Sequence, residues 1–113
     1  MPDYIARMLR QNASSDVKQW SHLSDFGPAG VKSKPNWECP DLFELPIEGE
    51  AGETRWVLET DIGRGAIAGG SGGEYFIGQF DGKQFVCDHP VDEVHWIDCG
   101  RDFYAPVSWS EIN

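Results

Sequence analysis

The sequence predicts an all-β fold: an antiparallel meander of short strands preceded by one short helix. After about residue 37 the chain alternates brief runs of β-branched and aromatic residues with turn-forming stretches, which is typical of a meander. One of these stretches, Asp81–Lys83, reads Asp-Gly-Lys and is a strong hairpin signal. The helix is predicted for the start of the chain, where four apolar residues have helical spacing: Tyr4, Ile5, Met8 and Leu9.

The elements follow in order along the chain. Pro2 and Asp3 suit a helix start, so the helix is predicted over Pro2–Arg10. Between Ser14 and Gly30, Ser-Asp and Gly-Pro pairs separate short apolar pieces, which indicates loop and strand. Six later runs are predicted as strands: Asp41–Leu45, Arg55–Asp61, Glu74–Phe80, Gln84–Cys87, Val94–Asp98 and Phe103–Trp109.

Two stretches echo each other. WECPDLFEL from Trp37 and GRDFYAPVSW from Gly100 each place an acid and an aromatic residue at the head of a predicted strand, about 64 residues apart. That spacing suits a four-stranded blade of a β-propeller with elaborated loops. If the first strand of each blade faces a central funnel, Glu38 and Asp102 would project into one pocket.

Composition excludes some partners. The 113 residues carry a net charge of -10, whereas nucleic-acid affinity comes mainly from lysine and arginine, so we expect neither nucleic acid nor an anionic membrane as partner. No apolar run approaches the ~18 residues of a spanning helix, and residues 1–12 lack the apolar core of an export signal. The three cysteines include no CxxC pair, so free buried thiols are expected.

Two motif matches are weak. GRGAIA at 63–68 imitates a dinucleotide fingerprint, but glycines and a strand follow it, so no helix start can receive a pyrophosphate. Four residues could ligate zinc, yet their irregular spacing matches no finger or knuckle: Cys87, His89, His95 and Cys99. Loop histidines and core thiols are the favoured interpretation, and we predict no metal and no cofactor.

Glu38 is the candidate for chemistry. It stands between Trp37 and Cys39, and removal of water on both sides would make a carboxyl hold its proton more tightly, as a general acid requires. The alternative is an ordinary loop carboxylate before a short strand.

Three motifs together resemble glycoside hydrolase family 32, the invertases, levanases and inulinases that hydrolyse β-fructosides. They are WECPDLFEL, AIAGGSGGEYFIGQFDGKQF and WIDCGRDFYAPVSWS, preceded by DVKQWSHLSDFGPAG, and they cover about Ser14–Ser110. The resemblance implies a five-bladed β-propeller with the active site in its central funnel, of which residues 1–113 would be a fragment of about one blade plus parts of its neighbours. It leaves the compartment open, since full-length members are often extracellular.

The resemblance also implies residue roles. Glu38, before Cys39, would be the acid/base that protonates the departing sugar oxygen and then activates water, with Trp37 and Cys39 holding it. Asp102, with Asp98 and Arg101 beside it, would contact sugar hydroxyls, although short polar residues at a strand entry also serve as turn caps. The implied partner is a β-fructan or sucrose. YAPVSWS and AIAGGSGGEYF look more like levanases and exo-inulinases than invertases, so a polymeric fructan is expected.

The sequence also departs from the family. It contains neither the Trp-Met-Asn-Asp-Pro-Asn-Gly-like motif of the nucleophile nor the Arg-Asp-Pro motif of the transition-state stabiliser. Two hypotheses therefore remain. The chain is a segment of a β-fructosidase whose other carboxylates lie on other sequence, or it is a non-catalytic sugar-binding or interaction module using three aromatic residues as platforms: Trp37, Tyr104 and Trp109. An excised blade is also expected to self-associate through its exposed edges.

Overall fold

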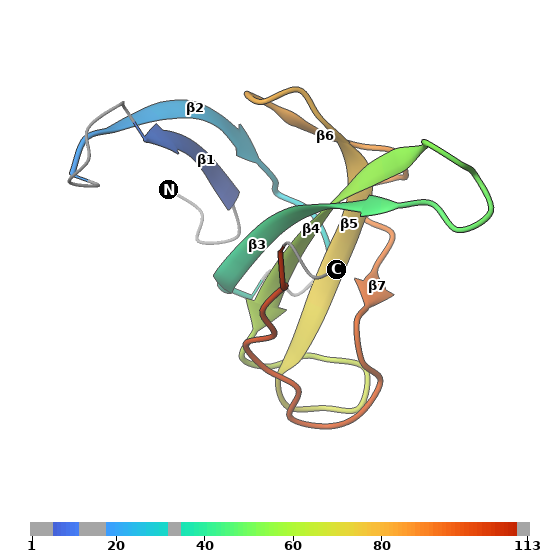
Figure 1. Cartoon of the computed structure of the whole chain (residues 1–113). Coiled ribbons are helices and arrows are strands. Elements are labelled where there is room, and N and C mark those ends of the chain that lie inside the picture. The colour runs from blue at the N-terminus through green and yellow to red at the C-terminus, as the bar shows by residue number, and fades with distance from the viewer. Residues whose placement is uncertain (1–5, 12–17, 32–34, 111–113) are drawn as a thin grey trace.

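The computed structural model describes residues 6–11, 18–31 and 35–110. These residues form seven strands in two antiparallel sheets, and no helix is found among them (Figure 1). The described part of the chain accordingly offers no helix that could cross a membrane. The prediction of an all-β antiparallel fold is confirmed.

The smaller sheet pairs β1 (Ala6–Gln11) with β2 (Trp20–Phe26). The predicted helix is therefore wrong over residues 6–10, and its first residues, 2–5, lie outside the described residues. A register shift between Met8 and Leu9 interrupts the regular pairing of β1 with β2. Around such a bulge, apolar residues need not alternate with polar ones as they do in a regular strand. Here the apolar residues are spaced as in a helix. Pairing with β2, whose residues are 9 to 20 positions away from their partners in β1, overrides this weak local pattern.

The larger sheet contains the other five strands in the order β3-β4-β5-β6, with β7 also pairing with β5. Their bounds are β3 Trp37–Pro46, β4 Thr54–Ile62, β5 Gly72–Phe80, β6 Phe85–Cys87 and β7 His95–Trp96. The first four lie where strands were predicted, although β3 begins four residues before the predicted run. β7 is shorter than the predicted Val94–Asp98.

The predicted hairpin turn joins β5 to β6. The Asp81 carboxylate accepts hydrogen bonds from the backbone N–H groups of Lys83 and Gln84, both at 2.8 Å, and Gly82 has a φ of 87°. A side chain is disfavoured at that φ, so glycine suits the position. The turn sets the register in which Phe80 pairs with Phe85.

The core lies between β2 and one face of the larger sheet. Phe26 of β2 contacts Phe76 and Phe85 edge-on, with ring centroids 5.2 and 5.1 Å apart, and stacks on Trp37 at 6.2 Å. Leu58 packs in the same cluster. Glu74 is buried at its edge, where burial raises the pKa of its carboxyl, and it accepts a hydrogen bond from the N–H of Val31 at 2.9 Å.

The predicted strand Phe103–Trp109 is wrong, because this segment has no regular secondary structure. Asp102 and Ala105 have positive φ angles of 62° and 53°, which a strand does not allow. The second copy of the echoed pattern is thus not a strand, and the proposed repeat is not supported. The segment instead crosses the face of the larger sheet opposite to the core (Figure 1).

Candidate active site

Four carboxylates share the face of the sheet that lies opposite the core. In the β3–β4 ladder Glu38 pairs with Asp61, and Asp41 pairs with Glu59. Paired residues point to the same face, and residues next to each other in a strand point to opposite faces. Because Trp37 and Leu58 belong to the core face, these four acids lie together on the other one. We call Glu38, Asp41, Glu59 and Asp61 the carboxylate face.

A bulge in β3 positions Glu38. The pairing register shifts between Glu38 and Asp41, and Cys39 within the shift has a φ of 46°. In the described residues, the non-glycine residues with positive φ are Cys39, Asp102 and Ala105. Such conformations cost free energy and are concentrated at functional sites. All three lie within two residues of Glu38 or Tyr104, whose side chains meet over this face.

The segment after β7 is held on the carboxylate face by three hydrogen bonds. The hydroxyl of Tyr104 donates to the Glu38 carboxylate. The N–H of Ala105 donates to Asp61 Oδ2 at 2.8 Å, and the N–H of Ser108 donates to Asp41 Oδ2 at 3.0 Å. Backbone donors of this segment are thus satisfied by side-chain carboxylates instead of a neighbouring strand.

Glu59 and Asp61 are buried, with 2 % and 0 % of their surface exposed. Burial raises the pKa of Glu59 to about 8, and the nearby Asp61 carboxylate contributes further by repulsion and by accepting a hydrogen bond. Burial also raises the pKa of Asp61, although the hydrogen bond from Ala105 opposes the rise. If both were ionised, Glu59 Oε1 and Oε2 and Asp61 Oδ1 would lack any donor. A proton that Glu59 shares with Asp61 would give this pair one hydrogen bond and remove one of its two negative charges, in agreement with the raised pKa of Glu59.

A cavity of about 730 Å³ opens beside the carboxylate face. Asp41 and Glu59 contribute its acidic wall, and Ile97, Val107 and Trp109 contribute apolar wall. A second hollow of about 410 Å³ next to it is lined by Cys39 and Ala105 among others. Polar groups in an apolar hollow are the usual composition of a small-molecule site.

The structure separates the side chains of Trp37, Glu38 and Cys39. Trp37 turns to the core, where its ring centroid lies 5.5 Å from that of Phe76, and it is therefore a packing residue. Glu38 and Cys39 are exposed. The expectation that Trp37 and Cys39 exclude water from Glu38 is wrong for the described residues, because Trp37 faces the core and Cys39, in the bulge, is itself exposed. Tyr104 is the side chain that contacts Glu38.

The other predicted site residues lie in the loop after β7. Asp98 Oδ1 accepts a hydrogen bond from the N–H of Gly100 at 2.7 Å, which is the turn-cap role left open by the sequence. Arg101 and Asp102 form an exposed ion pair at 3.8 Å, and Asp102 lies against Gly70. The hydrogen bonds and ion pairs described for these three residues do not join them to Glu38.

Sequence reasoning missed Glu59 and Asp61. A signal was available, because the run TRWVLETDI places two acids two residues apart inside an apolar strand. Acids on one face of a central strand are rare unless they have partners or a function.

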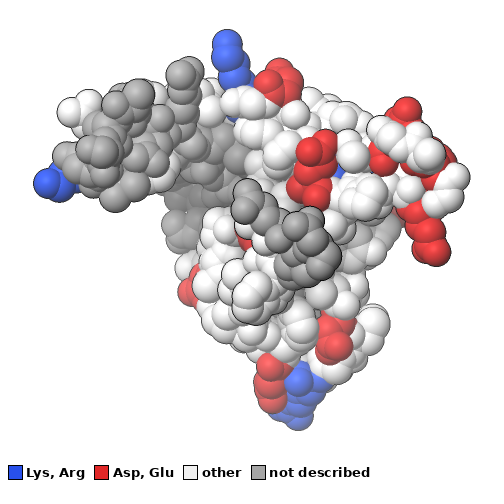
Figure 2. All heavy atoms as spheres, viewed as in Figure 1, with Lys and Arg blue, Asp and Glu red and all other residues white. Residues whose placement is uncertain are grey.

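Other acidic side chains gather at the turn between β3 and β4, where EGEAGE occupies residues 48–53 (Figure 2).

Comparisons with known proteins match the chain to a glycosidase family. The profile of the glycosyl hydrolases family 32 N-terminal domain matches residues 8–113. A levanase of Bacillus subtilis is 50% identical over 99 residues, which cover 88% of this chain and 15% of the levanase. An extracellular exo-inulinase of Aspergillus niger is 37% identical over 107 residues, covering 88% of this chain and 20% of the inulinase.

Solved structures agree with these matches. The β-fructofuranosidase of Schwanniomyces occidentalis, complexed with fructosyl-erythritol, superposes with a TM-score of 0.80 at 37% identity and covers 98% of this chain. The same enzyme complexed with fructose superposes with a TM-score of 0.81. The match extends over 20% of those chains, so this chain spans about a fifth or less of the length of these relatives.

Proposed function

The chain belongs to glycoside hydrolase family 32, and from this premise we propose that it is a segment of a catalytic β-propeller that hydrolyses β-fructosidic bonds in levan, inulin or sucrose. Residues 1–113 would supply about one blade with parts of its neighbours. Relatives of this chain include structures complexed with fructose and with fructosyl-erythritol, which supports a fructose-containing substrate.

In this proposal Glu38 is the general acid/base. The observation that carries it is the exposed Glu38 carboxylate, placed by a bulge in β3 and contacted by the Tyr104 hydroxyl from a segment 66 residues away. A retaining glycosidase needs such a group roughly 5 to 5.5 Å from a carboxylate nucleophile. Glu38 would donate its proton to the glycosidic oxygen as the bond to the fructosyl carbon breaks. It would then take a proton from the water that releases fructose.

The nucleophile would come from other sequence. Glu59 and Asp61 are poor candidates for it, because both are buried and burial raises the pKa of both carboxyls. In the proposal they position Tyr104. Asp61 accepts a hydrogen bond from the N–H of Ala105, and Ala105 is the residue next to Tyr104. Asp102, Asp98 and Arg101 remain proposed contacts to sugar hydroxyls on the leaving-group side, with Cys39 next to Glu38 in the bulge of β3.

A chimera tests the proposal. This chain would replace the matched stretch of the Bacillus subtilis levanase, which supplies the rest of the propeller. Glu38→Gln should then lower turnover of sucrose and levan by two or more orders of magnitude, because general acid–base catalysis contributes ~10²–10⁴-fold. A fructoside with a good leaving group should lose far less in its first step, since its departure needs no protonation.

Glu44→Gln is the matched control, because Glu44 lies on the same strand, is exposed, and contacts Thr54 on the neighbouring strand. It should leave turnover unchanged. If Glu38→Gln slows both kinds of substrate equally, or neither, Glu38 is not the acid/base.

One observation favours the second function, a non-catalytic sugar-binding module. Trp109 is 85% exposed and lines the 730 Å³ cavity, and exposed aromatic rings can stack on sugar rings. Measurable binding of levan fragments to the 113-residue chain, lost in Trp109→Ala, together with an active Glu38→Gln chimera, would select this function over the first.

A further inference from the structure

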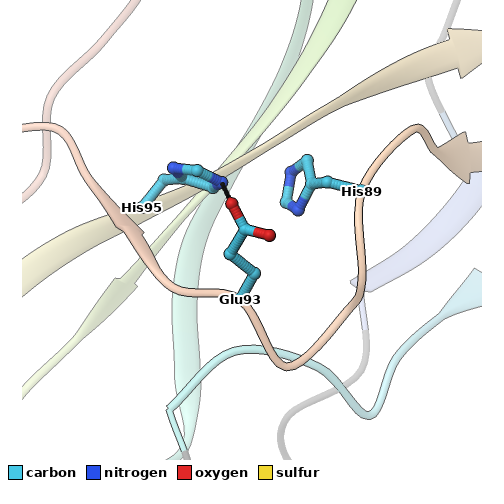
Figure 3. A group of neighbouring side chains, drawn as sticks. All are labelled: His89, Glu93 and His95. Atoms are coloured by element: carbon cyan, nitrogen blue, oxygen red, sulfur yellow. Dashed lines mark ion pairs between the residues drawn. The ribbon is translucent and has the colours of Figure 1, made fainter.

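We propose that His89, Glu93 and His95 form a zinc site that fastens the loop between β6 and β7 to the larger sheet. One ligand atom from each residue lies within 4.8 Å of those of the other two. Figure 3 shows the three side chains converging from the loop and from the start of β7. The site includes none of the four residues of the carboxylate face, and the proposal does not depend on the proposed β-fructosidase activity.

The donor set suits zinc. Two imidazoles and one carboxylate are ligands that Zn²⁺ takes, and three protein ligands leave a fourth position for water. Calcium and magnesium prefer sites made entirely of oxygen atoms. With bonds of 2.0–2.1 Å, tetrahedral ligand atoms lie about 3.3 Å apart. Glu93 Oε1 and His95 Nε2 are already 3.1 Å apart.

The backbone around the three ligands is held in place before any ion binds. The N–H of Asp88 donates to the carbonyl of Ile77 at 2.9 Å, and the N–H of Gly30 donates to the carbonyl of Val91 at 2.7 Å. Within the loop, the N–H of Glu93 donates to the carbonyl of Pro90 at 3.0 Å. At its far end His95 pairs with Tyr75 of β5. Small side-chain rotations would therefore suffice to close the site.

His89 has the hydrogen bonds of a ligand that is oriented by its surroundings. The N–H of Ile77 approaches its Nε2 at 3.3 Å, and its Nδ1 lies 3.2 Å from the carbonyl of Pro90. Both distances are at the long end for hydrogen bonds. A metal would bind Nε2 in place of the Ile77 N–H, because a neutral imidazole that binds a metal through one nitrogen carries its proton on the other, here Nδ1. The bond that remains then fixes the ring, as backbone carbonyls commonly do for metal-binding histidines.

The ligands are also accessible. The side chains of His95 and Glu93 are 31% and 53% exposed, so an ion can reach them from solvent. The cysteines of the zinc pattern considered from sequence, Cys87 and Cys99, are not part of this group. Glu93 takes their place because the chain reverses between His89 and His95, which spacing along the sequence does not reveal.

The test uses the 113-residue chain and zinc chloride alone. Calorimetric titration should show one zinc bound per chain, and thermal unfolding should move to higher temperature, because zinc binds the folded form preferentially. Glu93→Gln and His95→Ala should each weaken zinc binding by at least about tenfold, with loss of the thermal shift. Glu93 is exposed in a loop, so its variant retains the fold and can be interpreted even if His95→Ala fails to fold.

His22→Ala is the matched control. His22 also lies beside a carboxylate, with Nε2 3.0 Å from Asp25 Oδ1, but it is not part of the three-residue cluster. Its variant should bind zinc as the parent chain does. Unchanged zinc binding in Glu93→Gln, loss of binding in His22→Ala, or loss of binding only in Cys87→Ser and Cys99→Ser would each overturn the proposal.

Discussion

The hydroxyl of Tyr104 donates a hydrogen bond to the carboxylate of Glu38, although 66 residues separate them in the chain. This contact joins a bulged strand to a segment without regular structure. Asp61 is the β4 partner of Glu38, and its carboxylate accepts a hydrogen bond from the N–H of Ala105, the residue that follows Tyr104. Two acids on adjacent strands therefore determine where Tyr104 lies.

Removing the Tyr104 hydroxyl should impair catalysis more than binding. In the levanase chimera, Tyr104→Phe should lower kcat by roughly tenfold or more and change KM little, because a hydrogen bond to a charged group contributes about 1.5–3 kcal/mol. Steady-state kinetics on sucrose and levan measure both values. Tyr75→Phe is the control, since the Tyr75 ring packs against His95 and none of its contacts among the described residues is to Glu38. Equal losses in the two variants would contradict a positioning role for Tyr104.

Glu59 should make the chain less stable as pH rises. Its carboxyl binds a proton more tightly when folded, with a pKa raised from 4.5 to about 8, so its favourable contribution is complete below about pH 4.5 and is lost toward pH 8. Glu59→Gln keeps the shape without the titration. At pH 8 this variant should exceed the parent chain in free energy of unfolding by about 1 kcal/mol or more.

Denaturant titrations at pH 5 and pH 8 measure this effect. The exposed Glu44→Gln variant should follow the parent chain at both values. A parent chain whose stability does not fall between pH 5 and pH 8 would show that Glu59 is not held in its protonated form.

Gly78 should not tolerate a side chain. A Cβ at this position would lie 2.8 Å from the carbonyl carbon of Val86 and 3.0 Å from Cys87 Cα, both backbone atoms of β6. Gly78→Ala should therefore lower the free energy of unfolding by about 1–3 kcal/mol, measured by urea titration. Gly63→Ala is the control, because nothing lies within 4 Å of its Cβ position. A neutral Gly78→Ala would mean that β6 can move away from β5.

The 113 residues alone should release no fructose from sucrose, levan or inulin. The mechanism needs a nucleophile as well as an acid, and the motif that carries the family's nucleophile is absent from this sequence. The chain should also self-associate in a sedimentation experiment, because Val107 and Trp109 are 78% and 85% exposed and β3 pairs only with β4 among the described strands. Fructose release that disappears in Glu38→Gln would show that another carboxylate completes the site.

The levanase chimera should turn over levan and inulin faster than sucrose. The expectation rests on the motifs YAPVSWS and AIAGGSGGEYF, and the levanase of Bacillus subtilis and the exo-inulinase of Aspergillus niger are among the similar proteins. In the same chimera, Trp109→Ala should reduce the preference for levan and inulin over sucrose, because Trp109 lines the cavity beside the carboxylate face. Equal or better turnover of sucrose would contradict a fructan preference.

Local signals in the sequence were sufficient for much of the fold. β4, β5 and β6 lie where β-branched and aromatic runs predicted strands, and Asp81–Lys83 makes the expected turn. These features depend on residues that are neighbours in the chain. The three motifs that indicated family 32 are also local, and the comparisons confirm that family.

Tertiary structure decided the features that depend on distant residues. Residues 6–11 form a strand because β2 pairs with them, and residues 103–109 do not form one because Asp41 and Asp61 bind their backbone donors. The register of β3 against β4 brings four acids onto one face, and a chain reversal places Glu93 between two histidines. Sequence patterns located the strands of the larger sheet. The sites required contacts between segments that are far apart in the chain, and the spacing of residues along a sequence does not say how close they lie in space.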